Sequence, residues 1–116
     1  MSWDYYIVVK TEEGEPVIVG DGGGRNNYTS NVSGMYRKAF SKVKETTFQL
    51  DDLDNMKCKD ALPLLRRAIE EMENNPADYI PMNPENGWGN YGGAIDYLRR
   101  IAKDCIGHDR AWIEIS

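Results

Sequence analysis

Two stretches of this chain combine asparagines, aromatic residues and glycines immediately before a predicted helix. They read NNYTSNVSG over residues 26–34 and NPENGWGNYGG over residues 83–93. An asparagine side chain both donates and accepts hydrogen bonds, and a tryptophan or tyrosine ring offers a flat stacking surface. The N-terminus of a helix adds backbone N–H groups that suit a phosphate, carboxylate or carbonyl. These stretches therefore favour recognition of a small polar ring, such as that of a nucleotide.

We predict that the two loops form opposite walls of one ligand site. Tyr28 and Trp88 are expected to stack on the ligand, and Arg37 to meet an anionic group. The other residues predicted to bind ligand are Asn31, Ser33, Asn83, Asn86, Asn90 and Tyr91. A purely structural alternative stays open, in which the asparagines and glycines shape long turns while Trp88 and Tyr91 close the edge of a small core.

Charge is unevenly distributed along the chain. The formal net charge of −5 disfavours nucleic acid as a partner, because nonspecific binding to nucleic acid depends on lysine and arginine. Five basic residues nevertheless fall between Arg25 and Lys44, with no acidic residue among them, and five acidic residues fall within 70–85 with no base. The basic stretch suits a small anion beside the first loop; its alternative is a solvated helix face. Arg67 and Glu71, four residues apart, are expected to pair on a helix surface.

The sequence lacks the usual catalytic and metal-binding residue sets. His108 is the single histidine and follows a glycine at a predicted helix end, a position typical of a solvated or capping residue. DDLDN at 51–55 lacks the glycine and distal glutamate of a calcium loop, and GDGGGRN at 20–26 matches neither the phosphate-loop nor the dinucleotide-binding spacing. We therefore expect no catalytic residue, no metal and no cofactor, and we expect Cys58 and Cys105 to be unpaired thiols.

Three segments have the apolar spacing of helices. The first two, residues 35–44 and 61–75, follow candidate N-caps at Asn31 or Ser33 and at Asp60. A third helix begins after the second loop. The apolar stripes of the second and third helices should form much of the core, through Leu65, Ile69, Ala94, Ile95, Leu98, Ile101, Ala102 and Cys105.

The remaining elements are strands. Residues 3–10 and 15–20 are short, rich in β-branched and aromatic side chains and separated by a turn, which predicts an antiparallel hairpin. Residues 110–116 alternate between apolar and polar and predict a last strand beside the first. The resulting order, β-β-α-α-α-β, favours an α+β fold with a three-stranded, mainly antiparallel sheet and helices packed on one face.

Length and hydropathy bound the organisation of the chain. The 116 residues, 41% of them hydrophobic, suit a single domain over residues 1–116 with one modest core. No apolar run approaches the roughly 20 residues that a membrane span needs, and Asp4 stands where a signal peptide carries basic residues. We therefore expect no membrane contact and a cytoplasmic location.

Three segments carry a resemblance to known proteins: SWDYYIVV, NYTSNVSGMYRKAF and MNPENGWGNYGGAIDYLRRI. With them the chain resembles, over nearly its full length, a group of small uncharacterised bacteriophage or prophage proteins. That group has no assigned activity, so the resemblance implies a viral setting in the host cell cytoplasm and transfers no catalytic residue. Small phage proteins of this kind often act on host defence, and one class, the sponge proteins, sequesters nucleotide-derived signals such as cyclic ADP-ribose isomers.

These observations favour a non-enzymatic protein that binds a small polar, nucleotide-derived ligand, with a phage counter-defence sponge as its role. One alternative is an inhibitor or accessory factor that contacts a host protein through its acidic second helix and exposed aromatic residues. Another is a small nucleotide-processing enzyme that works through asparagine, tyrosine and arginine. A homo-oligomer also stays open, because sponges that enclose ligands often assemble, although the sequence shows no heptad repeat.

Overall fold

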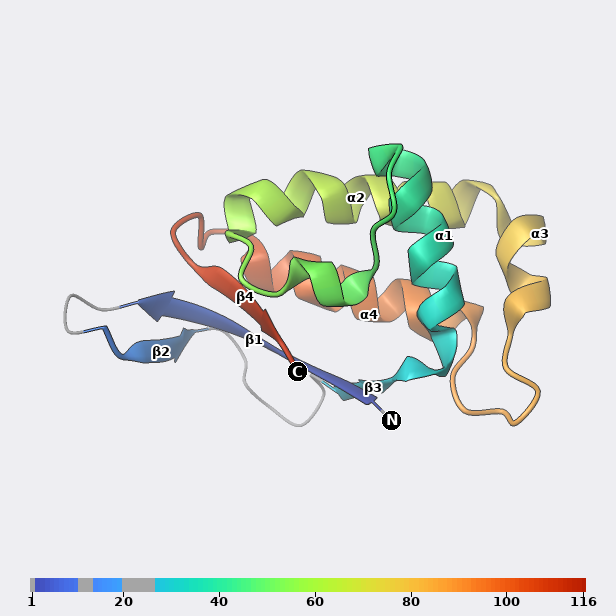
Figure 1. The fold of residues 1–116 in the computed structure, drawn as a ribbon, viewed down its shortest axis with the longest axis horizontal. Helices are drawn as coiled ribbons and strands as arrows, with labels where there is room; N and C mark the ends of the chain where they lie inside the picture. Colours follow the sequence, from blue (N-terminus) through green and yellow to red (C-terminus); the bar gives the residue numbers. More distant parts are fainter. Residues whose placement is uncertain (1, 11–13, 20–26) are drawn as a thin grey trace.

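The computed structural model describes residues 2–10, 14–19 and 27–116 (Figure 1). The strands in this part are β1 (Ser2–Lys10), β2 (Pro16–Val19), β3 (Asn27–Thr29) and β4 (Trp112–Ile115). The α-helices are α1 (Ser33–Lys44), α2 (Cys58–Asn74), α3 (Pro76–Tyr79) and α4 (Tyr91–Cys105), and there are 3₁₀ turns at Ser30–Val32, Leu50–Leu53 and Ile80–Met82. The fold is α+β, as the sequence predicts.

Every other described strand pairs with β1, and each pairing is antiparallel. β2 pairs with residues 7–10, which confirms the predicted hairpin, and β4 pairs with residues 5–8, which confirms that the last strand lies beside the first. An antiparallel sheet commonly has one face packed on the core, which suits a sheet that helices cover on one face.

β3 is a strand that the sequence analysis assigned to a loop, so the described sheet has four strands instead of three. β3 pairs with residues 2–4. The Asn27 amide secures this pairing, because its Nδ2 donates to Ser2 Oγ (3.0 Å), the Trp3 carbonyl (3.1 Å) and Asp4 Oδ1 (3.0 Å). Three residues are too few for strand alternation to be recognised in a sequence, and the side chain that holds them in place is a typical turn former.

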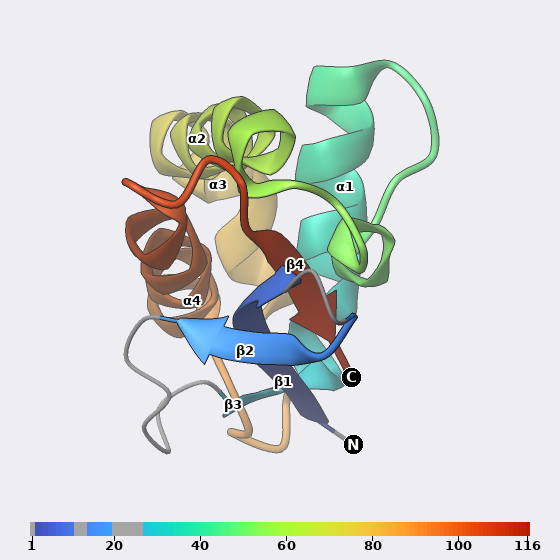
Figure 2. The same cartoon turned by 90° about the vertical axis from the view of Figure 1, so that its left-hand side faces the viewer.

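Helices α1, α2 and α4 lie on one face of the sheet (Figure 2), as predicted. Alternate residues of β1, namely Trp3, Tyr5 and Ile7, are buried in the same core cluster as the helices. Every residue of the apolar stripe predicted for α4 is buried, and Leu65 of α2 is buried while Ile69 is half-buried. The periodicity of the helices thus predicts the core well.

Two helices begin at residues other than those predicted. α1 begins at Ser33 after a 3₁₀ turn in which Thr29 Oγ1 accepts the N–H of Asn31 (3.3 Å), and no side-chain hydrogen bond caps α1 itself. α2 begins at Cys58, ahead of Asp60, because the Cys58 N–H donates to a carbonyl just before β4 (2.9 Å). The start of each helix is therefore set by structure outside it, which a capping pattern does not reveal.

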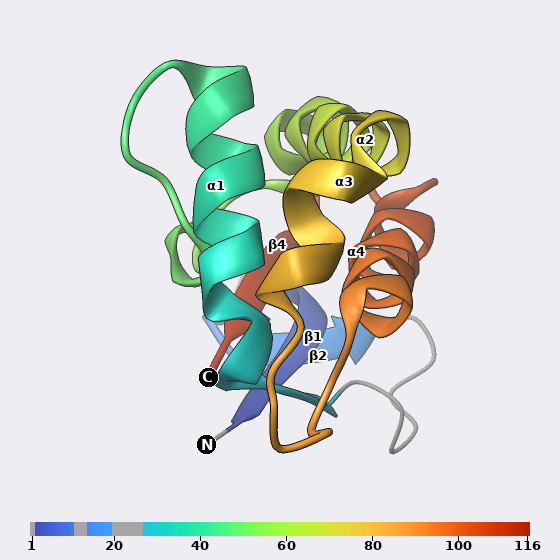
Figure 3. The ribbon, with the colours of Figure 1, turned by 90° about the vertical axis from the view of Figure 1, so that its right-hand side faces the viewer.

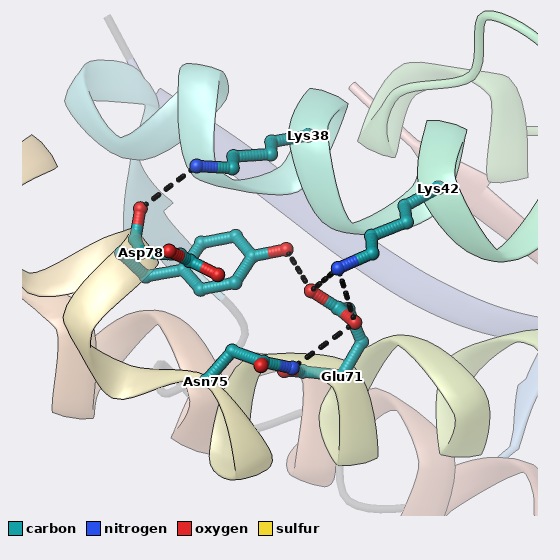
Figure 4. Close-up of polar contacts among 6 residues, drawn as sticks. Lys38, Lys42, Glu71, Asn75 and Asp78 are labelled. Atoms are coloured by element: carbon teal, nitrogen blue, oxygen red, sulfur yellow. Dashed lines mark hydrogen bonds and ion pairs between the residues drawn. The ribbon is translucent and has the colours of Figure 1, made fainter.

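The Glu71 carboxylate and Lys38, which donates to the Asp78 carbonyl (3.0 Å), both hold the short helix α3 at the end of the helix layer (Figures 3 and 4). Glu71 of α2, whose side chain is 11% exposed, accepts from the Tyr79 hydroxyl (2.7 Å) and from Asn75 Nδ2 (3.2 Å). The same carboxylate pairs with Lys42 of α1 at 3.3 Å. The three helices α1, α2 and α3 therefore share one acceptor, and charge-assisted hydrogen bonds of this kind are stronger than neutral ones.

The Arg67–Glu71 pair predicted on the surface of α2 is replaced by contacts between helices. Arg67 donates to the Val43 carbonyl near the end of α1 (2.5 Å), while Glu71 pairs with Lys42. Side-chain pairs four residues apart contribute only a few tenths of a kcal/mol, roughly 0.2–0.5. Partners from a packed neighbouring helix outweigh that gain.

Candidate ligand site

The two Asn-rich stretches meet at the end of the sheet where β3 pairs with β1. Asn90 of the second stretch donates its N–H to the Tyr28 hydroxyl (3.1 Å), and that hydroxyl donates to the Asn90 carbonyl (3.3 Å). Asn31 adds a longer contact from its Nδ2 to the Trp88 carbonyl (3.5 Å). The structure thus brings together the two loops that the sequence analysis assigned to one site.

An open pocket of about 670 Å³ lies where the loops meet. We call it the Trp88 pocket; its lining residues are Ser2, Asn27, Tyr28, Thr29, Asn31, Asn86, Trp88 and Gly89. Tyr28, Asn31, Asn86 and Trp88 are thus the predicted ligand-binding residues that line it. Trp88 is 69% exposed, so its indole does not close the edge of the core as the structural alternative supposed.

The second loop is shaped by its own asparagines. Asn83, Asn86 and Asn90 each accept, through Oδ1, a backbone N–H of the same loop, at 2.8, 3.0 and 2.7 Å respectively. Asn90 does so as the N-cap of α4. Bonds of this type hold turns and helix starts in a defined conformation. The asparagines therefore have a structural role, because their hydrogen bonds hold the loop that carries Trp88 in a defined conformation.

Two glycines allow this loop to approach β3 closely. Gly89 has a φ of +90°, and a Cβ there would lie 2.6 Å from Thr29 Cγ2. A Cβ on Gly93 would overlap the Tyr28 hydroxyl. A side chain at either position would push the loop away from β3, and only glycine adopts the backbone conformation of residue 89 without strain. The glycines thus serve the contact that forms the pocket.

Tyr28 connects the pocket to the core. Its ring stacks on Tyr97 of α4, with ring centroids 5.4 Å apart and 30° between the planes. Tyr97 is fully buried and donates its hydroxyl to the Trp3 carbonyl (3.3 Å), and burial raises the pKa of Tyr97 well above its ordinary value. This phenol therefore stays neutral at physiological pH. One wall of the pocket is backed by a packed aromatic residue.

The predicted ligand-binding residues that do not line the pocket are Ser33, Arg37, Asn83, Asn90 and Tyr91. Arg37 donates to Gln49 Oε1 (3.2 Å), so the predicted contact between Arg37 and an anionic group is not part of this pocket. Tyr91 packs against the core and donates its hydroxyl to the Met72 carbonyl (2.5 Å), which fits the structural alternative for this residue. Ser33 is the first residue of α1.

The structure also places residues in the pocket that the sequence analysis did not select. Asn27 and Thr29 adjoin Tyr28 in the first loop, and their polarity was a signal that could have included them. Ser2 reaches the pocket because it is the register partner of Thr29 in the β1–β3 pairing. No signal pointed to Ser2, because β3 itself was not predicted.

The charges near the pocket are unlike those expected from the sequence. The lining side chains that the structure describes are hydroxyl, amide and aromatic groups without formal charge. Among the described residues, the charged group bonded to one of them is the Asp4 carboxylate, which accepts from Asn27 Nδ2 at 3.0 Å. Arg25, part of the basic stretch noted above, lies outside the described residues. The described lining itself therefore offers no cation, and a carboxylate is bonded to one of its amides.

Other candidate chemistry is limited in the part of the chain that the structure describes. No group of three or more histidine, cysteine, aspartate or glutamate side chains there is arranged to hold a metal ion. Cys58 and Cys105 are both buried and unpaired. None of the described helices combines the length and the apolar character needed to cross a membrane.

Comparison with known proteins adds no functional assignment to this geometry. No protein-family model, curated protein or solved structure matches the chain. The phage setting therefore stays an expectation that rests on the quoted sequence segments, and functional reasoning rests on the pocket.

Proposed function

We propose that this chain is a non-enzymatic binding protein for a small, flat, polar ligand of nucleotide type, held in the Trp88 pocket. The observation that carries the proposal is an indole, 69% exposed, beside polar side chains from two loops that brace each other. An aromatic ring presented in this way can stack on a base, which contributes about 1–3 kcal/mol. The amides of Asn31 and Asn86 in the same pocket suit the donor and acceptor groups of a base edge.

The chemistry of the lining side chains favours binding over turnover. General acid–base and nucleophilic catalysis chiefly use carboxylate, imidazole, thiol or amine groups. The described lining instead consists of hydroxyl, amide and aromatic side chains and one glycine, and the Tyr28 hydroxyl is engaged with the backbone of Asn90. These properties support a ligand that is retained and not converted.

A protein that retains a nucleotide-derived ligand removes it from solution, which is how a sponge acts. The resemblance of segments such as MNPENGWGNYGG to phage proteins supports a counter-defence role. The pocket supports the part of that role that concerns a small ligand. We therefore propose sequestration of a nucleotide-derived signal as the biological action.

A second candidate function is inhibition of a host protein. Ile80, Met82 and Trp88 are exposed apolar side chains on the segment between α3 and α4, with exposed fractions of 47%, 37% and 69%. Exposed apolar side chains grouped on one segment are typical of protein contacts. This role predicts a stable protein complex that small nucleotides do not disturb.

Isothermal calorimetry with linear and cyclic ADP-ribose-type nucleotides tests the proposed function. Trp88→Ala and Asn31→Ala should weaken binding, with the loss of stacking in Trp88→Ala costing about 1–3 kcal/mol, while circular dichroism shows an intact fold. Ile106→Ala is a matched control, because it truncates a similarly exposed side chain (55%) beyond the opposite end of α4 and should leave binding unchanged.

Native mass spectrometry of the gently purified protein complements the titration, because it reports a retained ligand and the number of subunits together. A chain that binds no nucleotide but forms a stable complex with a host protein would support the second candidate. Consumption of the nucleotide during the titration would instead identify an enzyme.

A further inference from the structure

We infer that the Trp88 pocket recognises the uncharged nucleoside part of its ligand and leaves phosphate groups in solvent. This inference rests on the proposed function, since it names the part of a nucleotide that the pocket binds. It depends on three properties of the described residues: the charge of the lining, the state of the neighbouring helix N-termini, and the polar groups that are left for a ligand.

The part of the lining that the structure describes offers no cation to a phosphate. Its described side chains are uncharged, and the Asp4 carboxylate accepts from Asn27 Nδ2 at 3.0 Å. Arg37, the cation expected to meet an anionic group, donates to Gln49 instead. The net charge of −5 on the whole chain also disfavours anions in general. Phosphate recognition by an arginine or lysine is therefore not what the described geometry offers.

The N-terminus of α4, beside the pocket, is already capped by side chains from within the protein. In the first turn of α4, the N–H groups of Tyr91 and Gly93 donate to the Oδ1 atoms of Asn83 and Asn90, at 2.8 and 2.7 Å. Free N–H groups are what makes a helix N-terminus bind phosphate. A phosphate at α4 would have to displace these two asparagine oxygens.

Where the first loop leads into α1, no side chain caps the helix itself, but two backbone N–H groups of the preceding turn are bonded within the protein. The N–H of Asn31 donates to Thr29 Oγ1 at 3.3 Å, and the N–H of Ser33 donates to the Ser30 carbonyl. The N–H groups of Asn31 and Ser33 are therefore not free to bind an anion. Asn83 and Asn90, which the sequence suggested as ligand contacts, serve as caps of α4.

The polar groups left for a ligand are neutral and comprise a hydrogen-bond donor and a hydrogen-bond acceptor. Asn86 uses Oδ1 to accept the Trp88 N–H, and among the described residues its Nδ2 forms no hydrogen bond, which leaves a donor. Asn31 uses its Nδ2 in the 3.5 Å contact to the Trp88 carbonyl, which leaves its Oδ1 as an acceptor. A donor and an acceptor in the same pocket as an exposed indole suit the edge and the face of a nucleobase.

Calorimetry with adenosine, AMP and ADP-ribose tests the inference on the full chain. We expect adenosine to bind within about threefold of AMP and ADP-ribose, and affinity to change less than about twofold between about 50 mM and about 500 mM NaCl, because no charge pair is screened. Trp88→Ala should weaken all three ligands by the same factor, about 5- to 150-fold. Adenine and ribose, titrated alone, show which part of adenosine is bound.

The variant Arg37→Gln distinguishes a phosphate that stays in solvent from a phosphate that Arg37 binds. If phosphate stays in solvent, this variant binds adenosine and AMP as the wild type does. A loss of AMP affinity with adenosine unchanged, or AMP more than about tenfold tighter than adenosine in the wild type, would overturn the inference while the proposed function stands. If neither nucleosides nor nucleotides bind, the proposed function fails together with the inference.

Discussion

Replacing Gly93 by alanine is the most discriminating test of how the two loops fit together. Gly93 lies in the first turn of α4, where alanine ordinarily stabilises a helix by about 1 kcal/mol relative to glycine. In this structure a Cβ on Gly93 would overlap the Tyr28 hydroxyl and lie 3.0 Å from its Cζ. The tyrosine ring would therefore have to move, and the contact between β3 and the second loop would open.

The expected cost follows from the contacts that Tyr28 would lose. Its hydroxyl exchanges two hydrogen bonds with the Asn90 backbone, worth about 0.5–1.5 kcal/mol each. Its stacking on Tyr97 is worth about 0.5–1.5 kcal/mol more. After subtraction of the helix-propensity gain, Gly93→Ala should lower the free energy of unfolding by about 0.5–3.5 kcal/mol.

Gly92 is the matched control, because it occupies the preceding position of the same helical turn. A Cβ there meets Asn90 Oδ1 at 3.6 Å, an ordinary van der Waals contact. Gly92→Ala should therefore stabilise the protein, by about 0.4–1 kcal/mol. Urea unfolding of both variants measures the difference, and the two substitutions should have opposite signs.

Tyr28→Phe tests whether overlap with the Tyr28 hydroxyl is what makes Gly93→Ala destabilising. This variant removes the oxygen that the new Cβ would overlap, so Gly93→Ala should cost less in the Tyr28→Phe background than in the wild type. Equal stability of Gly93→Ala and Gly92→Ala, or an unchanged cost in the double variant, would show that Tyr28 does not hold the loop in the way described.

Three further predictions concern the core, the α3 contact and pH. Leu98→Ala should cost about 2–5 kcal/mol in thermal or urea melts, because Leu98 is fully buried, and an unchanged midpoint would contradict its place in the core. Glu71→Leu should cost about 1–3 kcal/mol in the same melts, since it leaves the Tyr79 hydroxyl without its acceptor, whereas Glu71→Gln keeps one and should cost less. Burial raises the pKa of Tyr5, Tyr36, Tyr79 and Tyr97 in the folded state, whereas in the unfolded chain they ionise near pH 10. The unfolded state therefore releases protons first and stability should fall as pH rises above about 10, which urea melts at pH 9 and 11 would check; equal stability at the two values would contradict it.

The helical core is the part of the fold that the sequence predicts best. The stripe from Ala94 to Cys105 repeats at helical spacing over three turns, and all of its members are buried. Such a pattern needs no knowledge of the rest of the chain, because any partner must cover the same face. The start of α2 at Cys58, in contrast, depends on a backbone bond to the segment before β4, which no local pattern encodes.

The sequence predicts the residue types of the candidate site but not the full set of residues that line it. Asparagines, aromatic residues and glycines in both loops indicated that the loops would share a site, and they do meet. Whether Arg37 points to that site depends on Gln49, which lies twelve positions further along the chain. Ser2 lines the pocket only through the register of a three-residue strand. Both depend on tertiary contacts, so residue type and spacing do not determine them.

The Tyr28 ring has one wall of the pocket on one side and the stacked core ring of Tyr97 on the other. A substitution of Tyr28 therefore disturbs stability and the pocket at once. Trp88 and Asn86 are exposed members of the lining, so substitution there leaves the core contacts in place. Under the proposed function, ligand preference can thus diversify through the second loop at little cost to folding, while β3 stays fixed.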